Sequence, residues 1–116
     1  PSRDFYDFED KYHADRAGLV VPAQLPPGVG AEAGRVAVEA CRALHVDSMA
    51  RVDFFFEDPG RGLLLNEVNT IPGFTPISMY PRMWAASGVP YASLVDELVD
   101  QALRRHARRS AFEVHP

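Results

Sequence analysis

The sequence predicts a small α/β fold of the α+β type, in which helices pack on an antiparallel β-hairpin. Two apolar runs, Met49 to Phe56, which is also rich in aromatic residues, and Gly62 to Val68, flank the turn sequence Asp58-Pro59-Gly60-Arg61. Helical periodicity precedes the hairpin at residues 31–44 and follows it at residues 93–103. Because the chain has only 116 residues, we expect a single core.

The helices are expected from apolar stripes and from the residues that begin or end them. The stripe of the first helix contains Val36, Ala37, Ala40, Cys41 and Leu44. The segment 69–81 is expected to be an ordered loop because it holds three prolines and a glycine. A short helix over residues 82–86 then ends at Ser87-Gly88. The last helix is expected to begin at Ser93, whose hydroxyl can cap it while Asp96 lies three residues on.

Composition argues against several classes of function. The formal net charge is −4, from 12 basic and 16 acidic residues, so nucleic acid is not an expected partner. No apolar run approaches the roughly 20 residues of a membrane span, so no membrane partner is expected either. The single cysteine, Cys41, has no intrachain disulfide partner, which makes the cytoplasm the expected compartment. The opening Pro1-Ser2-Arg3 has no initiator methionine and suggests a piece of a longer protein.

The register of the hairpin brings two carboxylates together. Centring its turn on Gly60 places Asp53 opposite Glu67 and Phe55 opposite Leu65. Like charges that face each other across a ladder destabilise it, so the two acidic residues require a compensating charge.

Two readings of this acidic pair follow from the residues around it. Arg51 and Asn69 extend the same face, and a divalent cation bound by the carboxylates and the neutral Asn69 oxygen would compensate the charge. Alternatively, no metal is bound: the pair faces solvent and Arg51 alone compensates it, or the assumed register is wrong by one residue. The loop that follows contains Gly73, where backbone N–H groups can approach an anion closely.

Five runs of the sequence resemble the carboxy-terminal portion of D-alanine:D-alanine ligases, members of the ATP-grasp superfamily. They are Ala50–Phe55, Leu65–Thr75, Ser78–Pro81, Phe5–Tyr12 and Val21–Ala23. The resemblance implies that residues 1–18 form an active-site, omega-like loop and that residues 19–103 form a carboxy-terminal ATP-grasp catalytic subdomain. Residues 104–116 remain as an arginine-rich tail outside the resemblance.

The resemblance also implies which residues bind metal and stabilise charge. Asp53, Glu67 and Asn69 match the family's ligands for magnesium, or manganese. Arg51 and the backbone of Gly73 match the groups that stabilise the oxyanion of the tetrahedral intermediate.

Substrate-binding roles follow in the same way. Lys11, Ser78 and the backbone of Met79 match the site that holds the carboxylate of the second D-alanine, and Tyr12 matches a loop tyrosine that helps to close the active site. Phe55 matches a residue that lines the adenine pocket. Without the resemblance, Lys11 and Tyr12 would be read as ordinary surface-loop residues and Ser78 as a turn hydroxyl.

The implied activity is ATP- and Mg-dependent ligation of two D-alanines through an acyl phosphate, which supplies D-alanyl-D-alanine for peptidoglycan synthesis. The chain would carry only part of the active site, because the family's amino-terminal and central domains are not in it, and we expect it to be inactive alone. The complete enzyme is expected to be a homodimer. Two alternatives stay open: a ligase joining D-alanine to D-lactate or D-serine, and a non-catalytic interaction module.

Overall fold

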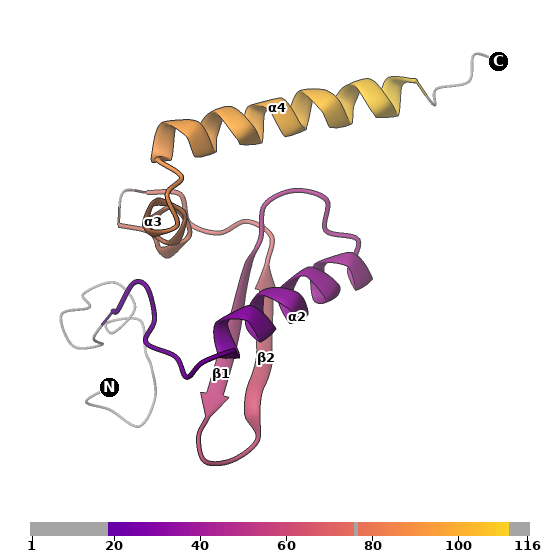
Figure 1. Ribbon diagram of the computed structural model, residues 1–116. Coiled ribbons are helices and arrows are strands. Elements are labelled where there is room, and N and C mark those ends of the chain that lie inside the picture. Colours follow the sequence, from indigo (N-terminus) through magenta and orange to yellow (C-terminus); the bar gives the residue numbers. More distant parts are fainter. Residues whose placement is uncertain (1–18, 76, 112–116) are drawn as a thin grey trace.

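The computed structural model describes residues 19–75 and 77–111, so Lys11, Tyr12 and the rest of the expected active-site loop lie outside the described residues. The elements follow one another as helix, hairpin and two further helices (Figure 1). Their bounds are α2 (Val29–Ala43), β1 (Arg51–Glu57), β2 (Gly62–Asn69), α3 (Met79–Ala86) and α4 (Tyr91–Ser110). This architecture confirms the expected α+β class with an antiparallel hairpin; α2 packs against the hairpin, whereas α3 and α4 pack against each other.

Helix α2 packs against β2 and ends just before Leu44. Gly28 precedes the helix with a left-handed φ of 88°, a conformation that glycine adopts without steric cost. Within the expected apolar stripe, Cys41 is half-buried rather than buried, and Leu44 is exposed because the helix has already ended. The apolar face of α2 is therefore only partly covered by the described part of the chain.

The hairpin ladder contains an irregularity that the sequence does not predict. Asp53 pairs with Glu67 as expected, but Phe55 pairs with Leu64 and not with Leu65. The register shifts between Asp53 and Phe54, which leaves Asn66 as an extra residue in β2. Without this bulge, Glu67 would point to the opposite face of the strand, since a one-residue slip exchanges the faces.

Helices α3 and α4 both begin earlier than predicted. Helix α3 starts at Met79 and not at Arg82. Pro81 is its third residue, and proline is tolerated there because the backbone N–H groups of the first helical turn have no partner within the helix. Helix α4 starts at Tyr91, so Ser93 lies inside the helix and does not cap it.

The C-terminal ends of these two helices lie in segments where the sequence carries clearer signals than at their N-terminal ends. The predicted end of α3 at residues 87–88 is confirmed: Gly88 has a φ of 89° and its N–H donates to the carbonyl of Ala85 at 3.1 Å. Helix α4 continues to Ser110, so the first part of the expected arginine-rich tail is helical.

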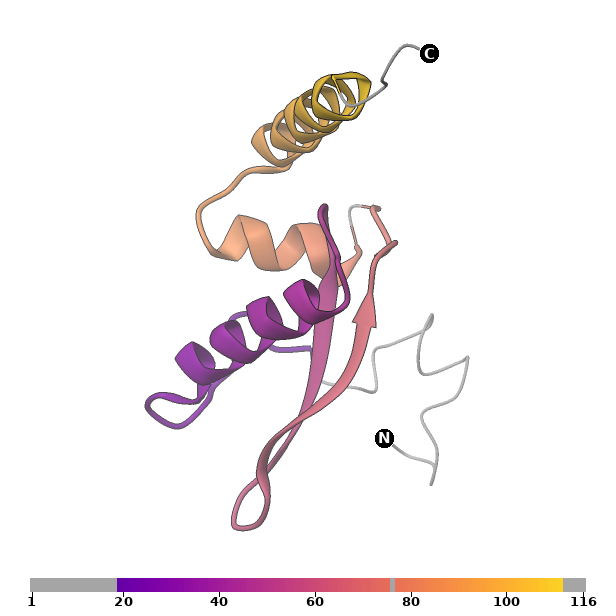
Figure 2. The ribbon, with the colours of Figure 1, turned by 90° about the vertical axis from the view of Figure 1, so that its right-hand side faces the viewer.

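The hydrophobic core of the described residues is small. Only two hydrophobic residues are buried, Tyr80 at 6% exposure and Leu94 at 4%, where α3 meets α4. Figure 2 shows α4 above α3 and away from the hairpin, with α2 beside the strands. Between these elements lies a cavity of about 750 Å³, and its apolar lining includes Val38, Cys41, Val46, Val52, Trp84 and Leu98. Apolar faces on three helices thus remain partly uncovered.

A single long-range ion pair connects α4 to the segment that joins α2 and β1. The Arg105 guanidinium donates to Asp47 at 2.8 Å across 58 positions of the sequence. Among the described residues, no helix is both long and apolar enough to span a membrane.

Candidate functional site

The end of the hairpin away from its turn gathers four polar residues on one face. Arg51 begins β1 opposite Asn69, the last residue of β2, and Asp53 lies opposite Glu67 two positions along. Residues paired directly across an antiparallel ladder point to the same side of the sheet. The extra residue Asn66 comes directly before Glu67, and bulges of this kind are common beside active sites because they re-aim a side chain.

Arg51 compensates much of the negative charge at this end of the hairpin. Its Nε and Nη2 atoms donate to the two carboxylate oxygens of Asp53 at 2.8 and 2.7 Å, and Nη2 lies 3.4 Å from Oε1 of Glu67. The hydrogen bond to Asp53 raises the pKa of Arg51 above its ordinary value, partial burial opposes this rise, and the charges of both carboxylates support it. One guanidinium therefore contacts both carboxylates of the acidic pair.

This donor set suits a hard divalent cation. Glu67 is 54% exposed at its side chain and makes only the longer contact with Arg51, so its oxygens are accessible. Across residues 19–75 and 77–111, no three His, Cys, Asp or Glu side chains gather as a metal site. A cation here would therefore bind two carboxylates and the Asn69 amide oxygen. Magnesium favours such sites, in which all ligands are oxygen atoms and the protein supplies only a few of them.

Asn69 also shapes the loop that leaves the hairpin. Its Oδ1 accepts a hydrogen bond from the backbone N–H of Ile71 at 3.0 Å, which turns the chain at the end of β2. An amide oxygen has a second lone pair, so this bond does not exhaust its capacity as an acceptor. After the turn Ile71 is 83% exposed and Pro72 is buried.

The loop folds back so that two predicted site residues, Gly73 and Ser78, lie against each other. A Cβ atom built on Gly73 would lie 2.9 Å from Oγ of Ser78, so only glycine fits there without displacing the serine. The same serine oxygen accepts from the backbone N–H of Thr75 at 3.0 Å and lies 2.8 Å from the Thr75 hydroxyl. Ser78 then leads directly into Met79, the first residue of α3.

Aromatic rings fix this loop to the helices behind it. The centroid of Phe74 lies 6.0 Å from that of Tyr80 and 5.2 Å from that of Tyr91, and Tyr80 packs edge-on against Trp84 at 6.4 Å. The Tyr91 hydroxyl also approaches the carbonyl of Phe74 at 3.4 Å. The loop is therefore anchored to α3 and α4 through ring packing.

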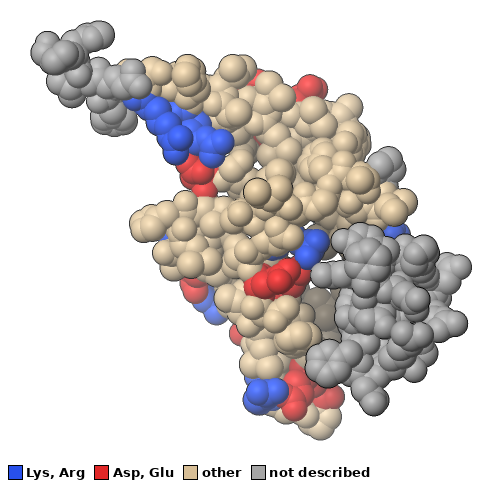
Figure 3. Space-filling view, turned by 180° about the vertical axis from the view of Figure 1, so that it is seen from behind, with Lys and Arg blue, Asp and Glu red and all other residues tan. Residues whose placement is uncertain are grey.

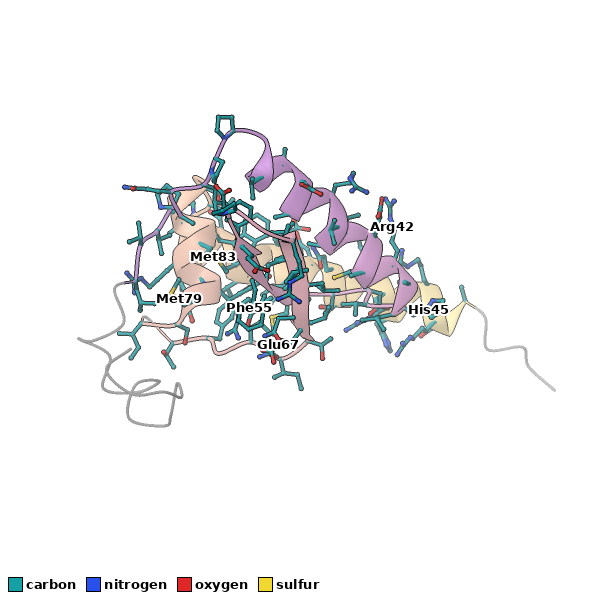
Figure 4. The ribbon with its side chains drawn as sticks, turned by 90° about the horizontal axis from the view of Figure 1, so that it is seen from below. Arg42, His45, Phe55, Glu67, Met79 and Met83 are labelled. Atoms are coloured by element: carbon teal, nitrogen blue, oxygen red, sulfur yellow. The ribbon has the colours of Figure 1, made fainter. Side chains whose placement is uncertain are left out.

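The predicted site residues fall into two groups within the described chain. Arg51, Asp53, Glu67 and Asn69 share one face of the hairpin, while Gly73, Ser78 and Met79 lie in the loop that leaves it and at the start of α3. Phe55 is 62% exposed and shares a strand face with Asp53; Figure 4 shows Phe55 and Glu67 on the hairpin and Met79 on α3.

Sequence reasoning missed one polar residue of this site, Thr75. The residue ends the Leu65–Thr75 run, but its hydrogen bonds to Ser78 depend on a turn whose shape the local sequence does not reveal.

Comparisons with known proteins show which family the chain resembles. The family model described as "D-ala D-ala ligase C-terminus" matches residues 1–100. The D-alanine–D-alanine ligase of Solibacter usitatus is 54% identical over 109 residues, which cover 94% of this chain and 34% of that protein. The chain therefore spans about a third of the length of this relative.

Two solved structures show the same fold. The D-alanine–D-alanine ligase of Coxiella burnetii matches 77% of this chain and 25% of its own at 45% identity, with a TM-score of 0.73. The ligase of Bacillus anthracis, whose structure is a complex with ATP, matches 74% of this chain and 30% of its own at 29% identity, with a TM-score of 0.66. These likenesses confirm the expected ATP-grasp carboxy-terminal fold. The chain belongs to the D-alanine–D-alanine ligase carboxy-terminal family.

Proposed function

We propose that this chain forms the carboxy-terminal third of an ATP-dependent ligase that joins two D-alanine molecules. The observation that carries the proposal is the face of the hairpin on which Asp53 opposes Glu67 with Arg51 between them, directly before a glycine-containing loop. Relatives that are about half identical to this chain carry the name D-alanine–D-alanine ligase. Because the chain spans about a third of them, the activity requires the segments that they carry in addition.

The acidic face is the proposed site for magnesium or manganese, with Asp53, Glu67 and Asn69 as ligands. The opposed carboxylates, the neighbouring Asn69 amide oxygen and the accessible Glu67 oxygens support this assignment. A bound divalent cation would neutralise charge on the phosphoryl groups of ATP. The ATP complex of the Bacillus anthracis relative supports ATP as the co-substrate. Phe55, exposed on the same face of β1, is proposed to line the adenine pocket.

Arg51 and the backbone N–H of Gly73 are proposed to stabilise the oxyanion of the tetrahedral intermediate. The bidentate contact with Asp53 fixes the guanidinium, and the packing of Gly73 against Ser78 fixes the loop backbone. Positive charge and N–H dipoles held in place before the reaction stabilise developing negative charge without reorganisation.

The second D-alanine is proposed to bind through its carboxylate at the start of α3. Ser78 and the backbone of Met79 would hold this carboxylate together with Lys11, and Tyr12 would help to close the site. The half-buried position of Ser78 beside Gly73 supports a binding role for its hydroxyl. Lys11 and Tyr12 lie outside the described residues, and their roles rest on the resemblance of their loop to the family.

The proposed reaction has two steps. The carboxylate of the first D-alanine takes the γ-phosphoryl group of ATP and releases ADP. The amine of the second D-alanine then attacks the acyl phosphate, loses a proton and releases phosphate, which leaves D-alanyl-D-alanine. Holding the two reactants in line contributes much of the rate enhancement. We place this reaction in the cytoplasm, in a homodimeric enzyme that supplies peptidoglycan synthesis.

The proposal is tested on what we call the completed ligase: this chain joined to the preceding two-thirds of the enzyme, taken from its own gene or from the Solibacter usitatus ligase. We expect D-alanine to stimulate ADP release and D-alanyl-D-alanine to be the product by mass spectrometry. The isolated 116-residue chain should release no ADP. Release of ADP by the isolated chain would refute the proposed division of the active site.

A competition experiment defines the second substrate. With equal D-alanine and D-lactate at pH 7, we expect mostly D-alanyl-D-alanine, because a tyrosine at position 12 adds no positive charge that would repel the ammonium form of D-alanine. A product that is mostly D-alanyl-D-lactate would assign the enzyme to the depsipeptide-forming class.

A further inference from the structure

The hydroxyl of Ser78 occupies an unusual position for a residue at the start of a helix. Ser78 is the N-cap of α3, yet its side chain makes no capping hydrogen bond. A capping hydroxyl accepts from the backbone N–H of the second or third helical residue, and the third residue of α3 is Pro81, which has no N–H. The serine oxygen instead accepts from the backbone N–H of Thr75 at 3.0 Å.

Two further hydrogen bonds join Thr75 to Ser78. The side-chain oxygens of the two residues lie 2.8 Å apart, and the backbone N–H of Ser78 donates to the carbonyl of Thr75 at 2.9 Å. Gly73 lies against the serine side chain as well, because a Cβ there would lie 2.9 Å from the serine oxygen. The position of Ser78 Oγ is thus set by its neighbours in the loop.

The numbers of donors and lone pairs on the two hydroxyl groups indicate a role for Thr75. A hydroxyl group has two lone pairs and one proton. Either hydroxyl can be the donor in the 2.8 Å hydrogen bond between Thr75 and Ser78. A carboxylate only accepts, so when Ser78 donates its proton to one, the Thr75 hydroxyl must be the donor in that bond. Ser78 Oγ then accepts from both the N–H and the hydroxyl of Thr75.

We propose that Thr75 is a positioning residue that fixes Ser78 Oγ and supplies both hydrogen bonds that this oxygen accepts while Ser78 donates to the carboxylate of the second substrate. This inference rests on the proposed function, in which Ser78 binds that carboxylate. The Thr75 hydroxyl can act as the donor to Ser78 Oγ, which leaves the serine proton for the carboxylate.

The test compares Thr75→Val and Thr75→Ser in the completed ligase. Valine keeps the shape but removes the hydroxyl donor, so we expect the KM for the second D-alanine to rise about tenfold with kcat nearly unchanged. Serine keeps the donor and should restore KM to within about twofold of the parent. Thr70→Val, at an exposed threonine earlier in the same loop, serves as the matched control and should leave KM unchanged.

A double variant separates positioning from a general effect on the loop. If Thr75 acts through Ser78, then adding Thr75→Val to Ser78→Ala should change KM little beyond the effect of Ser78→Ala alone. Independent multiplication of the two effects, or a Thr75→Ser variant as impaired as Thr75→Val, would overturn the inference.

The activity of the parent enzyme distinguishes a failure of the proposed ligase function from a failure of the positioning role of Thr75. A completed ligase that forms no D-alanyl-D-alanine contradicts the proposed function itself. A parent that forms the dipeptide, together with a Ser78→Ala variant of unchanged KM, leaves the ligase activity established but overturns the positioning role of Thr75. Melting temperatures of all variants should stay close to the parent value, because Thr75 is exposed.

Discussion

The two ends of the hairpin carry the same kind of ion pair in different surroundings. At the open end, Arg51 contacts Asp53 at 2.7 Å with side chains that are 25% and 31% exposed. At the turn end, Arg61 contacts Glu57 at the same distance, but the side chains are 75% and 46% exposed. Figure 3 shows a mixed acidic and basic patch at the tip of the hairpin and another farther up the molecule.

The difference lies in what surrounds each pair. Around Arg51, a second carboxylate from Glu67 lies 3.4 Å from the guanidinium, Asn69 adds an amide oxygen, and the glycine-containing loop follows directly. The Arg61 pair is more exposed to solvent, and such pairs contribute little to stability. An arginine–carboxylate pair alone therefore does not indicate function. The second carboxylate, the amide oxygen and the glycine-containing loop beside a partly buried pair distinguish the open end.

The largest effect is expected from Arg51→Ala in the completed ligase. The substitution removes the proposed oxyanion-stabilising charge and the guanidinium that contacts both Asp53 and Glu67. We expect kcat to fall about 1000-fold, the upper end for loss of one such group. Steady-state kinetics measure the change. Arg51→Lys should recover only part of it, because lysine cannot make the bidentate contact.

The matched substitution Arg61→Ala, at the other end of the same hairpin, should leave kcat within about twofold of the parent. Equal losses for the two arginine variants would mean that the two ends of the hairpin do not differ in function.

A smaller but still large effect is expected from Glu67→Gln. Glutamine keeps the shape of the side chain and removes its charge, so kcat at ordinary magnesium should fall at least ~100-fold. The apparent magnesium affinity, measured by varying the metal at saturating ATP, should fall as well. Glu57→Gln is the control at the turn end and should behave as the parent. Parental activity for Glu67→Gln would show that this carboxylate has only a structural role.

The same two ends show how far the sequence can predict the structure. Centring the turn on Gly60 is slightly wrong, because the observed ladder places the centre between Pro59 and Gly60. The extra residue Asn66 cancels this error, so Asp53 and Glu67 pair as predicted although Phe55 and Leu65 do not. The bulge is invisible in the local pattern, because an asparagine in an exposed strand position has no distinctive periodicity.

The helix ends are harder to predict than the helices themselves. Prolines argue for a loop before residue 82, yet Pro81 is accepted in the first turn of α3. The Ser93–Asp96 pair has the spacing of a capping box, but Pro90 occupies the N-cap and the helix begins at Tyr91. Local signals of this kind compete, and the packing of Tyr91 on Phe74 is a tertiary contact that the sequence does not reveal.

The two asparagines of β2, Asn69 and Asn66, are expected to differ in function although both lie near the open end of the hairpin. Asn69 is half-buried, turns the loop through Ile71 and is a proposed metal ligand, whereas Asn66 is the exposed bulge residue. We expect Asn69→Ala to weaken the apparent magnesium affinity about tenfold, because a neutral oxygen ligand contributes less than a carboxylate. Asn66→Ala should leave the affinity near that of the parent. A larger loss for Asn66→Ala would place the determinant in the bulge itself.

The smallest effect is expected at the turn end, from a double-mutant cycle on Glu57 and Arg61. Exposed ion pairs gain little Coulomb energy in water and lose side-chain entropy, so the coupling energy should be about 0.5 kcal/mol or less. Thermal or urea unfolding of the completed ligase and its single and double variants measures this energy, provided that the transition is two-state. Salt at 1 M should remove most of it, because screening then acts over about 3 Å. A coupling above about 2 kcal/mol that persists in salt would mean that the turn end is organised like the open end, and the contrast between the two pairs would fail.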